Sequence, residues 1–390
     1  MNIGTENSAR KSYAGKRNYA QNPLIVYWEM TQACALACRH CRAEAVLKCH
    51  PHQLNHEESR DLLRQLAGFG DPLPHLILTG GDPLERPDLY ELIDEAQSLG
   101  LQVSITPSAT EALTAEAMQK LKVHGIQSLG LSLDGSNAAR HEAVRGVPGC
   151  FGWTMRAAHA AAEVGLPIQM NTLVSEETAD DLEAIYQVLT HLKVMRWSLF
   201  FLIAVGRGKA LRELTPEAGE KLMNRIYDLA VRAPFAIKTT EAPHYRRVAL
   251  HRMRGLKIAP EALHRISVFN GFSIRDGHGI VFISNTGEIC PAGFLPASAG
   301  NVRTSSVPDV YRYSQLFRAL HNPDELKGKC GKCEYREICG GSRARAFAHT
   351  ADPLESDPFC PYQPGGRGRA EDFTAAGSHG TSSRVLPSLT

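Results

Sequence analysis

Short apolar, β-branched runs alternate with amphipathic stretches along the first half of the chain. The runs have the length and composition of buried strands, and they are Leu24–Glu29, His75–Thr79, Gln102–Thr106, Gln127–Leu133, Ile168–Leu173 and Arg196–Ile203. Apolar residues recur at helical spacing in the stretches 57–68, 88–98, 112–123, 152–165 and 178–191. Asn55, with Glu58 three residues on, predicts a capping box for the first helix. Since neighbouring parallel strands need a crossover, the pattern predicts an α/β fold with a parallel sheet.

Six strands with intervening helices match a partial (β/α)6 TIM-like barrel, and a doubly wound sheet is the alternative. We expect the barrel over residues 22–205, and a linker with substrate-side helices over 206–300. The helices are predicted at 214–232 and 244–254, and a hairpin at 279–289 turns at Asn285-Thr286-Gly287. A small cysteine-rich extension should follow over 301–362. The polar leader 1–21 and the Gly/Ser/Ala-rich tail 363–390 are expected to be disordered.

Composition narrows the class of protein. The 390 residues are 43% hydrophobic, which is enough for a large core. The 43 basic and 41 acidic residues nearly cancel, so charge predicts neither nucleic-acid binding nor a basic membrane surface. We see no apolar run long enough to cross a membrane and no secretory signal.

Cysteine usage indicates metal chemistry. Ten cysteines in a non-secreted chain are more typical of metal or redox ligands than of disulfides. Cys34, Cys38 and Cys41 follow the first strand in a C-x3-C-x2-C spacing. Three thiolates can hold a [4Fe–4S] cluster and leave one iron open to a ligand, at the strand end that carries chemistry in parallel barrels. A zinc loop or incidental cysteines are the alternatives.

A second group of cysteines lies near the C-terminus in a C-x2-C-x5-C-x20-C spacing, at Cys330, Cys333, Cys339 and Cys360. Four thiolates can close a [4Fe–4S] cluster or a structural zinc site, and this weakly periodic segment needs a metal to fold. Cys290 is open to several interpretations: a relic ligand, a core thiol or a substrate-side residue. Cys49 and Cys150 fall in no ligand spacing.

Polar residues also follow the other predicted strands. Gly80-Gly81-Asp82-Pro83 follows the second strand, and its carbonyls and carboxylate suit an ammonium group, although alone it would be an ordinary turn. The fourth strand ends at Ser132-Leu133-Asp134-Gly135, with Arg145 further on, and the fifth carries Asn171 and Leu173. Thr106-Pro107-Ser108 is a weaker candidate at the third. Strand ends of one parallel sheet share an edge, so these residues should surround the cysteine loop.

The cysteine loop, Gly-Gly-Asp-Pro and Ser-x-Asp-Gly…Arg together resemble the radical S-adenosylmethionine (SAM) superfamily. The resemblance implies that a cluster on Cys34, Cys38 and Cys41 binds SAM and splits it reductively into methionine and a 5′-deoxyadenosyl radical. It implies SAM-binding roles for Gly80, Gly81, Asp82, Pro83, Ser132, Asp134, Arg145, Asn171 and Leu173. His40 and Asp82 depart conservatively from the superfamily pattern, which often has another aromatic residue and Glu there. A reductant such as ferredoxin or flavodoxin is the implied partner.

The C-terminal cysteines resemble the SPASM/twitch-type branch, whose members carry auxiliary clusters. Position 343 is Arg where that branch has a cysteine, and upstream only Cys290 is available. The resemblance therefore implies one auxiliary [4Fe–4S] cluster on the four C-terminal cysteines, and a second is not supported. Since iron–sulfur clusters are oxygen-labile, we expect a cytoplasmic, low-oxygen setting.

The sequences of residues 339–345 and 351–360 are similar to those of enzymes that modify tetrapyrroles, namely the alternative heme synthase and heme d1 types. This resemblance implies an iron–sulfur oxidoreductase that decarboxylates iron-coproporphyrin propionates in heme biosynthesis. Propionates need cations, and Arg pairs well with carboxylates. The candidates are Arg207, His244, Arg246, Arg247 and Arg275. The alternatives are a maturase acting on a ribosomally made peptide or another cofactor, and a non-catalytic scaffold.

Overall fold

The structure is a computed structural model that describes residues 17–253 and 273–365. Most of the predicted leader and tail lies outside the described residues. Residues 17–21, which we expected to be disordered, are packed: the Arg17 guanidinium donates to the Leu73 carbonyl at 3.0 Å, and the Tyr311 hydroxyl donates to the Tyr19 carbonyl.

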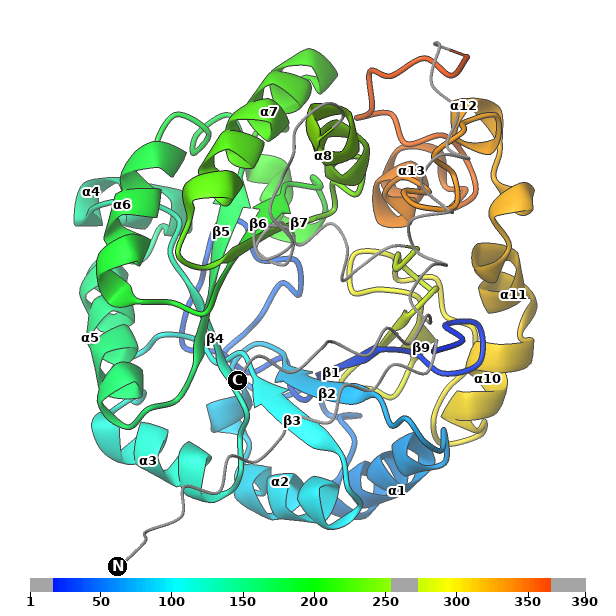
Figure 1. The fold of residues 1–390 in the computed structure, drawn as a ribbon. Coiled ribbons are helices and arrows are strands. Elements are labelled where there is room, and N and C mark those ends of the chain that lie inside the picture. The colour runs from blue at the N-terminus through cyan, green and yellow to red at the C-terminus, as the bar shows by residue number, and fades with distance from the viewer. Residues whose placement is uncertain (1–16, 254–272, 366–390) are drawn as a thin grey trace, which may run out of the picture.

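A nine-stranded sheet in the order β7-β6-β5-β4-β3-β2-β1-β8-β9 forms the body of the protein. Its strands are β1 Ile25–Glu29, β2 His75–Thr79, β3 Gln102–Ile105, β4 Leu129–Ser132, β5 Ile168–Val174, β6 Arg196–Phe201, β7 Ala236–Thr240, β8 Ile280–Ile283 and β9 Ile289–Cys290. All neighbours pair in parallel except β8 and β9. The sheet curves inside a ring of helices (Figure 1), which confirms the partial barrel over the doubly wound alternative.

The six predicted strands correspond to β1–β6, but the sheet is larger than predicted. β7 and β8 come from residues 206–300, where we expected a linker, helices and a hairpin, and each extends the sheet in parallel. The expected hairpin forms between β8 and β9, where Gly287 adopts a φ of 88° in the turn. β8 also pairs with β1, so the hairpin is joined to the barrel.

The helices around the sheet are α1 His56–Ala67, α2 Leu89–Ser98, α3 Ala115–Val123, α4 Ala138–Arg145, α5 Cys150–Glu163, α6 Leu182–Leu192, α7 Pro216–Arg232 and α8 Tyr245–Met253. The predicted capping box at Asn55 and Glu58 is present, with reciprocal hydrogen bonds of 3.0 and 2.9 Å. α4 was not predicted, because its sequence AARHEAVR is short and its apolar stripe is weak. No helix in the described residues is long and apolar enough to cross a membrane.

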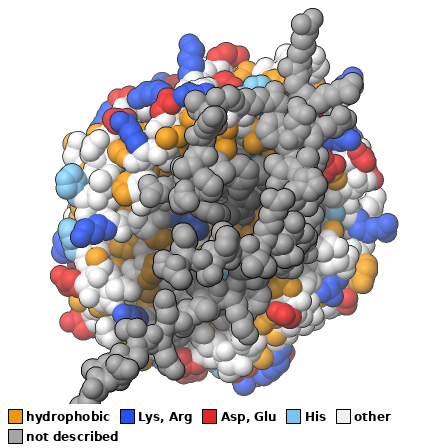
Figure 2. Space-filling model, viewed as in Figure 1, with side chains coloured by type: hydrophobic (Ala, Val, Ile, Leu, Met, Phe, Trp, Pro, Cys, Tyr) orange, Lys and Arg blue, Asp and Glu red, His pale blue; other side chains and the backbone are white. Residues whose placement is uncertain are grey.

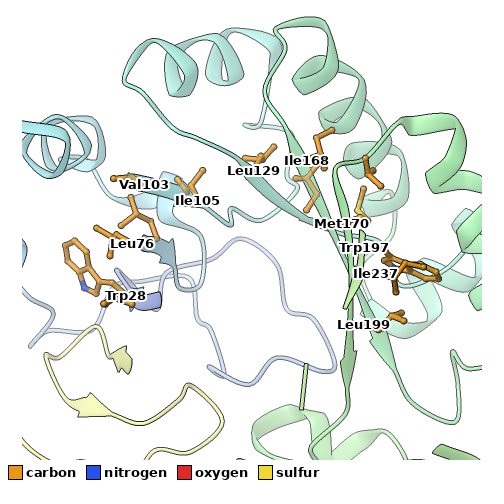
Figure 3. Packing of buried hydrophobic residues seen from close by; sticks show 14 of the residues in the cluster. Trp28, Leu76, Val103, Ile105, Leu129, Ile168, Met170, Trp197, Leu199 and Ile237 are labelled. Carbon is orange, nitrogen blue, oxygen red and sulfur yellow. The ribbon is translucent and has the colours of Figure 1, made fainter. Parts of the chain in front are cut away.

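The strands present two different faces. Buried apolar side chains such as Trp28, Met170, Trp197 and Ile237 point toward the helices (Figure 3) and form the main core. Because successive strand residues point to opposite sides, the residues between them face the inside of the barrel. The inside holds a cavity of about 540 Å³ lined by both apolar and polar side chains. Side chains that alternate between the two faces of the sheet therefore form an apolar core on the outside and line the cavity on the inside.

The C-terminal extension carries short helices, α10 Val307–Tyr313, α11 Gln315–His321, α12 Gly328–Gly331 and α13 Arg343–Thr350. Two buried arginines of α13 hold it together. Arg343 donates to the Pro353 carbonyl at 2.8 Å, and Arg345 contacts Glu213 at 2.5 Å and the Leu202 carbonyl at 2.7 Å. Arg345 thus fastens the extension to the barrel. Charged side chains of both signs are scattered over the face seen in Figure 2, in keeping with the balanced composition.

Candidate active site

The first cysteine loop leaves β1 at the C-terminal edge of the sheet. Cys34 and Cys38 are buried, and Cys41 is half-buried. Backbone N–H groups point at the sulfurs: Leu36 donates to Cys34 Sγ at 3.3 Å and Ala45 to Cys41 Sγ at 3.5 Å. Hydrogen bonds from backbone N–H groups to the cysteine sulfurs are one of the means by which proteins tune an iron–sulfur cluster, so this loop suits a cluster.

Gly80 and Gly81 fit tightly against this loop. Gly81 N donates to the Thr31 carbonyl and Asp82 N to the Ala33 carbonyl, both at 2.7 Å. A Cβ at Gly80 would lie 2.5 Å from the Thr31 oxygen, and one at Gly81 would lie 2.3 Å from the Ala33 oxygen. The contact with the cysteine loop therefore requires both glycines.

Asp82 offers a free acceptor beside the cysteine loop. Its Oδ1 accepts hydrogen bonds from Leu84 N at 3.1 Å and Ser108 N at 3.3 Å, while Oδ2 is buried without a partner in the described structure. Ser108 Oγ lies 3.2 Å from Cys34 Sγ. Burial raises the pKa of Asp82 to about 6. An unpaired buried acceptor of this kind fits an ammonium group.

Asp134 and Arg145 form a buried ion pair at the end of β4. Arg145 donates to Asp134 Oδ2 at 2.9 Å and, through its other terminal nitrogen, to Cys38 Sγ at 3.4 Å. Leu173 N donates to Asp134 Oδ1 at 2.7 Å. Burial alone would raise the pKa of Asp134, but His40 and Arg145 hold it below its usual value. Each carboxylate oxygen thus has one protein donor, and Asp134 also lines the main cavity.

The remaining predicted SAM residues line the barrel cavity. Ser132, Asn171 and Leu173 face it from β4 and β5. His40 also lines it, 3.8 Å from Asp134, and burial lowers the pKa of this imidazole to about 4. His40 is therefore a neutral ring at neutral pH, and it can stack or donate one hydrogen bond.

The second group of cysteines also converges. Cys330, Cys333, Cys339 and Cys360 line one small cavity, although they span 31 positions of the sequence. Backbone N–H groups again reach the sulfurs: Asp357 N donates to Cys330 at 3.3 Å and Gly341 N to Cys339 at 3.4 Å. The predicted set is thus brought together in space.

The geometry of both groups bears on which metal they fit. Among the described residues, no three His, Cys, Asp or Glu side chains are close enough to surround a single ion. Four thiolates at about 2.3 Å from zinc would have to crowd around one point. A [4Fe–4S] cluster holds its thiolates further apart, because four irons lie between them. Cysteine thiolates are ligands of both kinds of site.

Arg207 lies beside the first cysteine loop and outside the cavity lining. It is in the 3-10 turn η2 Gly206–Ala210, and its guanidinium donates to the Cys38 and Ala45 carbonyls, both at 3.0 Å. Its backbone N–H donates to the Cys41 carbonyl at 3.2 Å. This placement argues against the substrate role expected from the sequence and assigns Arg207 to bracing the loop.

The other substrate candidates are also held by protein groups. Arg246 donates to the Ile338 and Ile274 carbonyls at 2.9 and 2.7 Å. Arg275 donates to the Leu320 carbonyl at 3.0 Å. Both line the main cavity, but terminal nitrogens of each guanidinium already donate to these carbonyls, and Arg275 Nε is buried without a partner among the described residues.

His244 and Arg247 line the small cysteine cavity instead of the main one. Arg247 pairs with Glu220 at 2.5 Å and lies over the Tyr362 ring. His244 is buried, and burial lowers its pKa to about 4. The five candidates therefore do not form one anion site.

The sequence analysis missed five Arg, Lys, Asp or Glu side chains of the main cavity. They are Arg42, Arg196 of β6, Lys238 of β7, Glu241 and Asp276. Burial raises the pKa of Glu241 to about 8, and its carboxylate accepts a hydrogen bond from Ser342 Oγ at 2.5 Å. The alternation Ala-Ile-Lys-Thr-Thr in β7, with Ile237 fully buried, was the signal that could have revealed an inward lysine.

Comparison with known proteins gives a consistent picture. Residues 28–189 match the Radical SAM superfamily. The chain is 35% identical to the AdoMet-dependent heme synthase of Methanosarcina barkeri, over 88% of this chain and 97% of that protein. It is 36% identical to the protein of the same name from Nitratidesulfovibrio vulgaris, over 87% and 92%. The fold resembles Streptococcus suis SuiB bound to S-adenosylmethionine, with a TM-score of 0.67 and 17% identity over 88% of this chain and 78% of SuiB.

Proposed function

The chain belongs to the radical SAM superfamily, and from this premise we propose that it is a heme synthase. The proposed reaction removes the carboxylates of two propionate side chains of iron-coproporphyrin III and leaves two vinyl groups. The observation that carries the proposal is the similarity to two AdoMet-dependent heme synthases over nearly the whole length of each protein. The cavity of about 540 Å³ is within the usual range for a bound organic ligand, roughly 300–1,000 Å³.

The residues around the first cysteine loop fit SAM and its cluster. When bound, these groups supply a 5′-deoxyadenosyl radical that abstracts a hydrogen atom. Cys34, Cys38 and Cys41 would hold the cluster, with backbone N–H groups directed at the sulfurs. Asp82 Oδ2, which has no partner in the described structure, would accept a hydrogen bond from the ammonium group of SAM.

The walls of the cavity would orient the nucleoside and the substrate. Ser132 and Asn171 can hydrogen-bond the ribose, and Leu173 can pack on the adenine. Arg145 contacts Asp134 and Cys38, and we therefore propose that it positions the cluster loop as well as the SAM carboxylate.

Each decarboxylation must dispose of one electron. A propionate side chain loses one hydrogen atom to the radical, and its carboxylate then leaves as CO2, so that one electron remains to be transferred. We propose that an auxiliary [4Fe–4S] cluster on Cys330, Cys333, Cys339 and Cys360 accepts this electron. The main cavity reaches toward this site, since Gly341 lines both cavities.

A product assay tests the proposed function. Reconstituted protein is incubated without oxygen with SAM, dithionite and iron-coproporphyrin III, and the products are identified by mass spectrometry. We expect heme and 5′-deoxyadenosine. Formation of 5′-deoxyadenosine with unchanged iron-coproporphyrin III would reject this substrate in favour of a peptide or another cofactor. Absence of both products from cluster-loaded protein would reject the proposed reaction altogether.

A further inference from the structure

Two basic side chains share one wall of the barrel cavity. Arg196 is the first residue of β6 and Lys238 is the middle residue of β7, and both line the cavity. The parallel register places Arg196 opposite Ala236 and Ser198 opposite Lys238. Arg196 and Lys238 are therefore diagonal neighbours on the same face of the sheet, within reach of each other's long side chains.

These two cations lack a carboxylate partner in the described part of the chain. Arg196 donates one hydrogen bond, to Gln169 Oε1 at 3.4 Å, and Lys238 makes neither a hydrogen bond nor an ion pair there. Burial and the charge of Arg196 lower the pKa of Lys238 to about 8, and burial also lowers the pKa of Arg196. Both side chains are half-buried, and an unpaired charge that is partly removed from water is costly, so this wall is suited to bind an anion.

A third hydrogen-bond donor faces the same space. Tyr27 of β1 lines the cavity, and burial raises its pKa to about 12, so its hydroxyl keeps its proton at neutral pH. The charge of Arg196 acts on both Tyr27 and Lys238. The other arginines of the lining are engaged, because Arg42 pairs with Glu29 at 2.5 Å and Arg246 and Arg275 donate to carbonyls.

We propose that Arg196 and Lys238 bind a carboxylate of the substrate. The proposal rests on the proposed function, because iron-coproporphyrin III carries propionates on its rim. Arg196 is the first residue of β6 and lies at the N-terminal edge of the sheet. The cysteine loop follows the last residue of β1 and lies at the opposite, C-terminal edge. A strand rises about 3.3 Å per residue, so the two sites are separated by roughly 15 Å. The carboxylate bound here is therefore one that does not react, and it sets the orientation of the ring toward the radical.

The first experiment measures binding of iron-coproporphyrin III to cluster-loaded protein by absorbance titration. We compare wild type with Lys238→Met, Arg196→Met and the matched control Lys221→Met, which removes an exposed lysine of α7. Loss of a charge-assisted hydrogen bond should raise Kd about 10- to 100-fold in the first two variants, with no change in the control. Formation of 5′-deoxyadenosine without substrate should be unchanged in all of them. Equal Kd values in all four proteins would overturn the proposal.

A second experiment does not depend on the identity of the tetrapyrrole. Sodium acetate, compared with sodium chloride at equal ionic strength, is used as a carboxylate probe in thermal unfolding of the cluster-loaded protein. Acetate should raise the Tm of wild type by about 1–2 °C and leave that of Lys238→Met unchanged. If wild type does not bind iron-coproporphyrin III but shows this acetate effect, the proposed function fails and the anion site stands. Equal acetate shifts in both proteins would refute the anion site.

Discussion

Arg145 contacts both Asp134, at 2.9 Å, and the sulfur of Cys38, at 3.4 Å. One guanidinium thus connects the end of β4 to the loop that holds the three cysteines. In the cluster-loaded protein, this cation would lie beside a sulfur that binds iron. The pair is buried, so its charges act at short range with little screening from water.

Replacement of Arg145 should therefore affect both stability and cluster loading. Arg145→Gln leaves Asp134 charged and buried, which should cost about 3–5 kcal/mol of unfolding free energy and lower the iron content. Arg232→Gln is the control, since Arg232 pairs with Glu183 at the surface and its loss should cost under about 1 kcal/mol. Thermal unfolding and iron analysis of the two variants check this. Equal losses of stability and iron content in the two variants would mean that the buried Arg145–Asp134 pair contributes no more than a surface ion pair.

The glycine next to the cysteine loop provides a steric test. Gly81→Ala brings a methyl group to within 2.3 Å of the Ala33 carbonyl, so the loop must move. We expect a loss of about 1–3 kcal/mol and weaker SAM binding, measured by unfolding and equilibrium dialysis. In the control Gly152→Ala, the new methyl group meets only the end of the Arg156 side chain at 3.5 Å. If Gly81→Ala binds SAM as wild type does, the close contact is not needed for the site.

Asp82 predicts a pH dependence of SAM binding. Its pKa of about 6 in the free protein means that the carboxylate is charged above pH 6 and protonated below it. Only the charged form pairs with an ammonium group, so SAM affinity should be constant above about pH 7 and should fall tenfold per pH unit well below 6. Asp82→Asn should bind more weakly and lose this dependence. An identical pH profile in both proteins would show that Asp82 does not contact the ammonium group.

The proposed auxiliary cluster separates SAM cleavage from product formation. Cys333→Ala removes one thiolate of the second cysteine group and should lower the iron content while 5′-deoxyadenosine still forms. Heme formation should stop, because the remaining electron has no acceptor. Cys49→Ala, which replaces an exposed cysteine, is the matched control. If Cys333→Ala still makes heme at the wild-type rate, the second group has only a structural role.

Much of the fold was readable in the sequence because apolar runs and helical periodicity repeat regularly. β7 was not predicted, because three of its five residues, Lys238-Thr239-Thr240, are polar. The prediction relied on continuous apolar runs, and this strand does not form one. Such a strand is recognised only when the neighbour that buries its other face is known.

The candidate site was predictable in the part that depends on local spacing. The cysteines and the Gly80–Gly81 loop converge because they follow neighbouring parallel strands. Which arginines are engaged by the protein was not predictable, because their partners are distant in sequence: Arg246 donates to the carbonyl of Ile338, 92 positions away. Sequence shows that an arginine is present, but the fold decides whether its guanidinium is free.

Isotope transfer tests the central claim most directly. Iron-coproporphyrin III deuterated at the propionate carbons next to the ring is incubated without oxygen with SAM, dithionite and the cluster-loaded protein. We predict that 5′-deoxyadenosine gains one deuterium and that heme appears, and that neither product forms with Cys38→Ala. Unlabelled 5′-deoxyadenosine accompanied by unchanged iron-coproporphyrin III would contradict the account, because the radical would then not act on a propionate of this substrate.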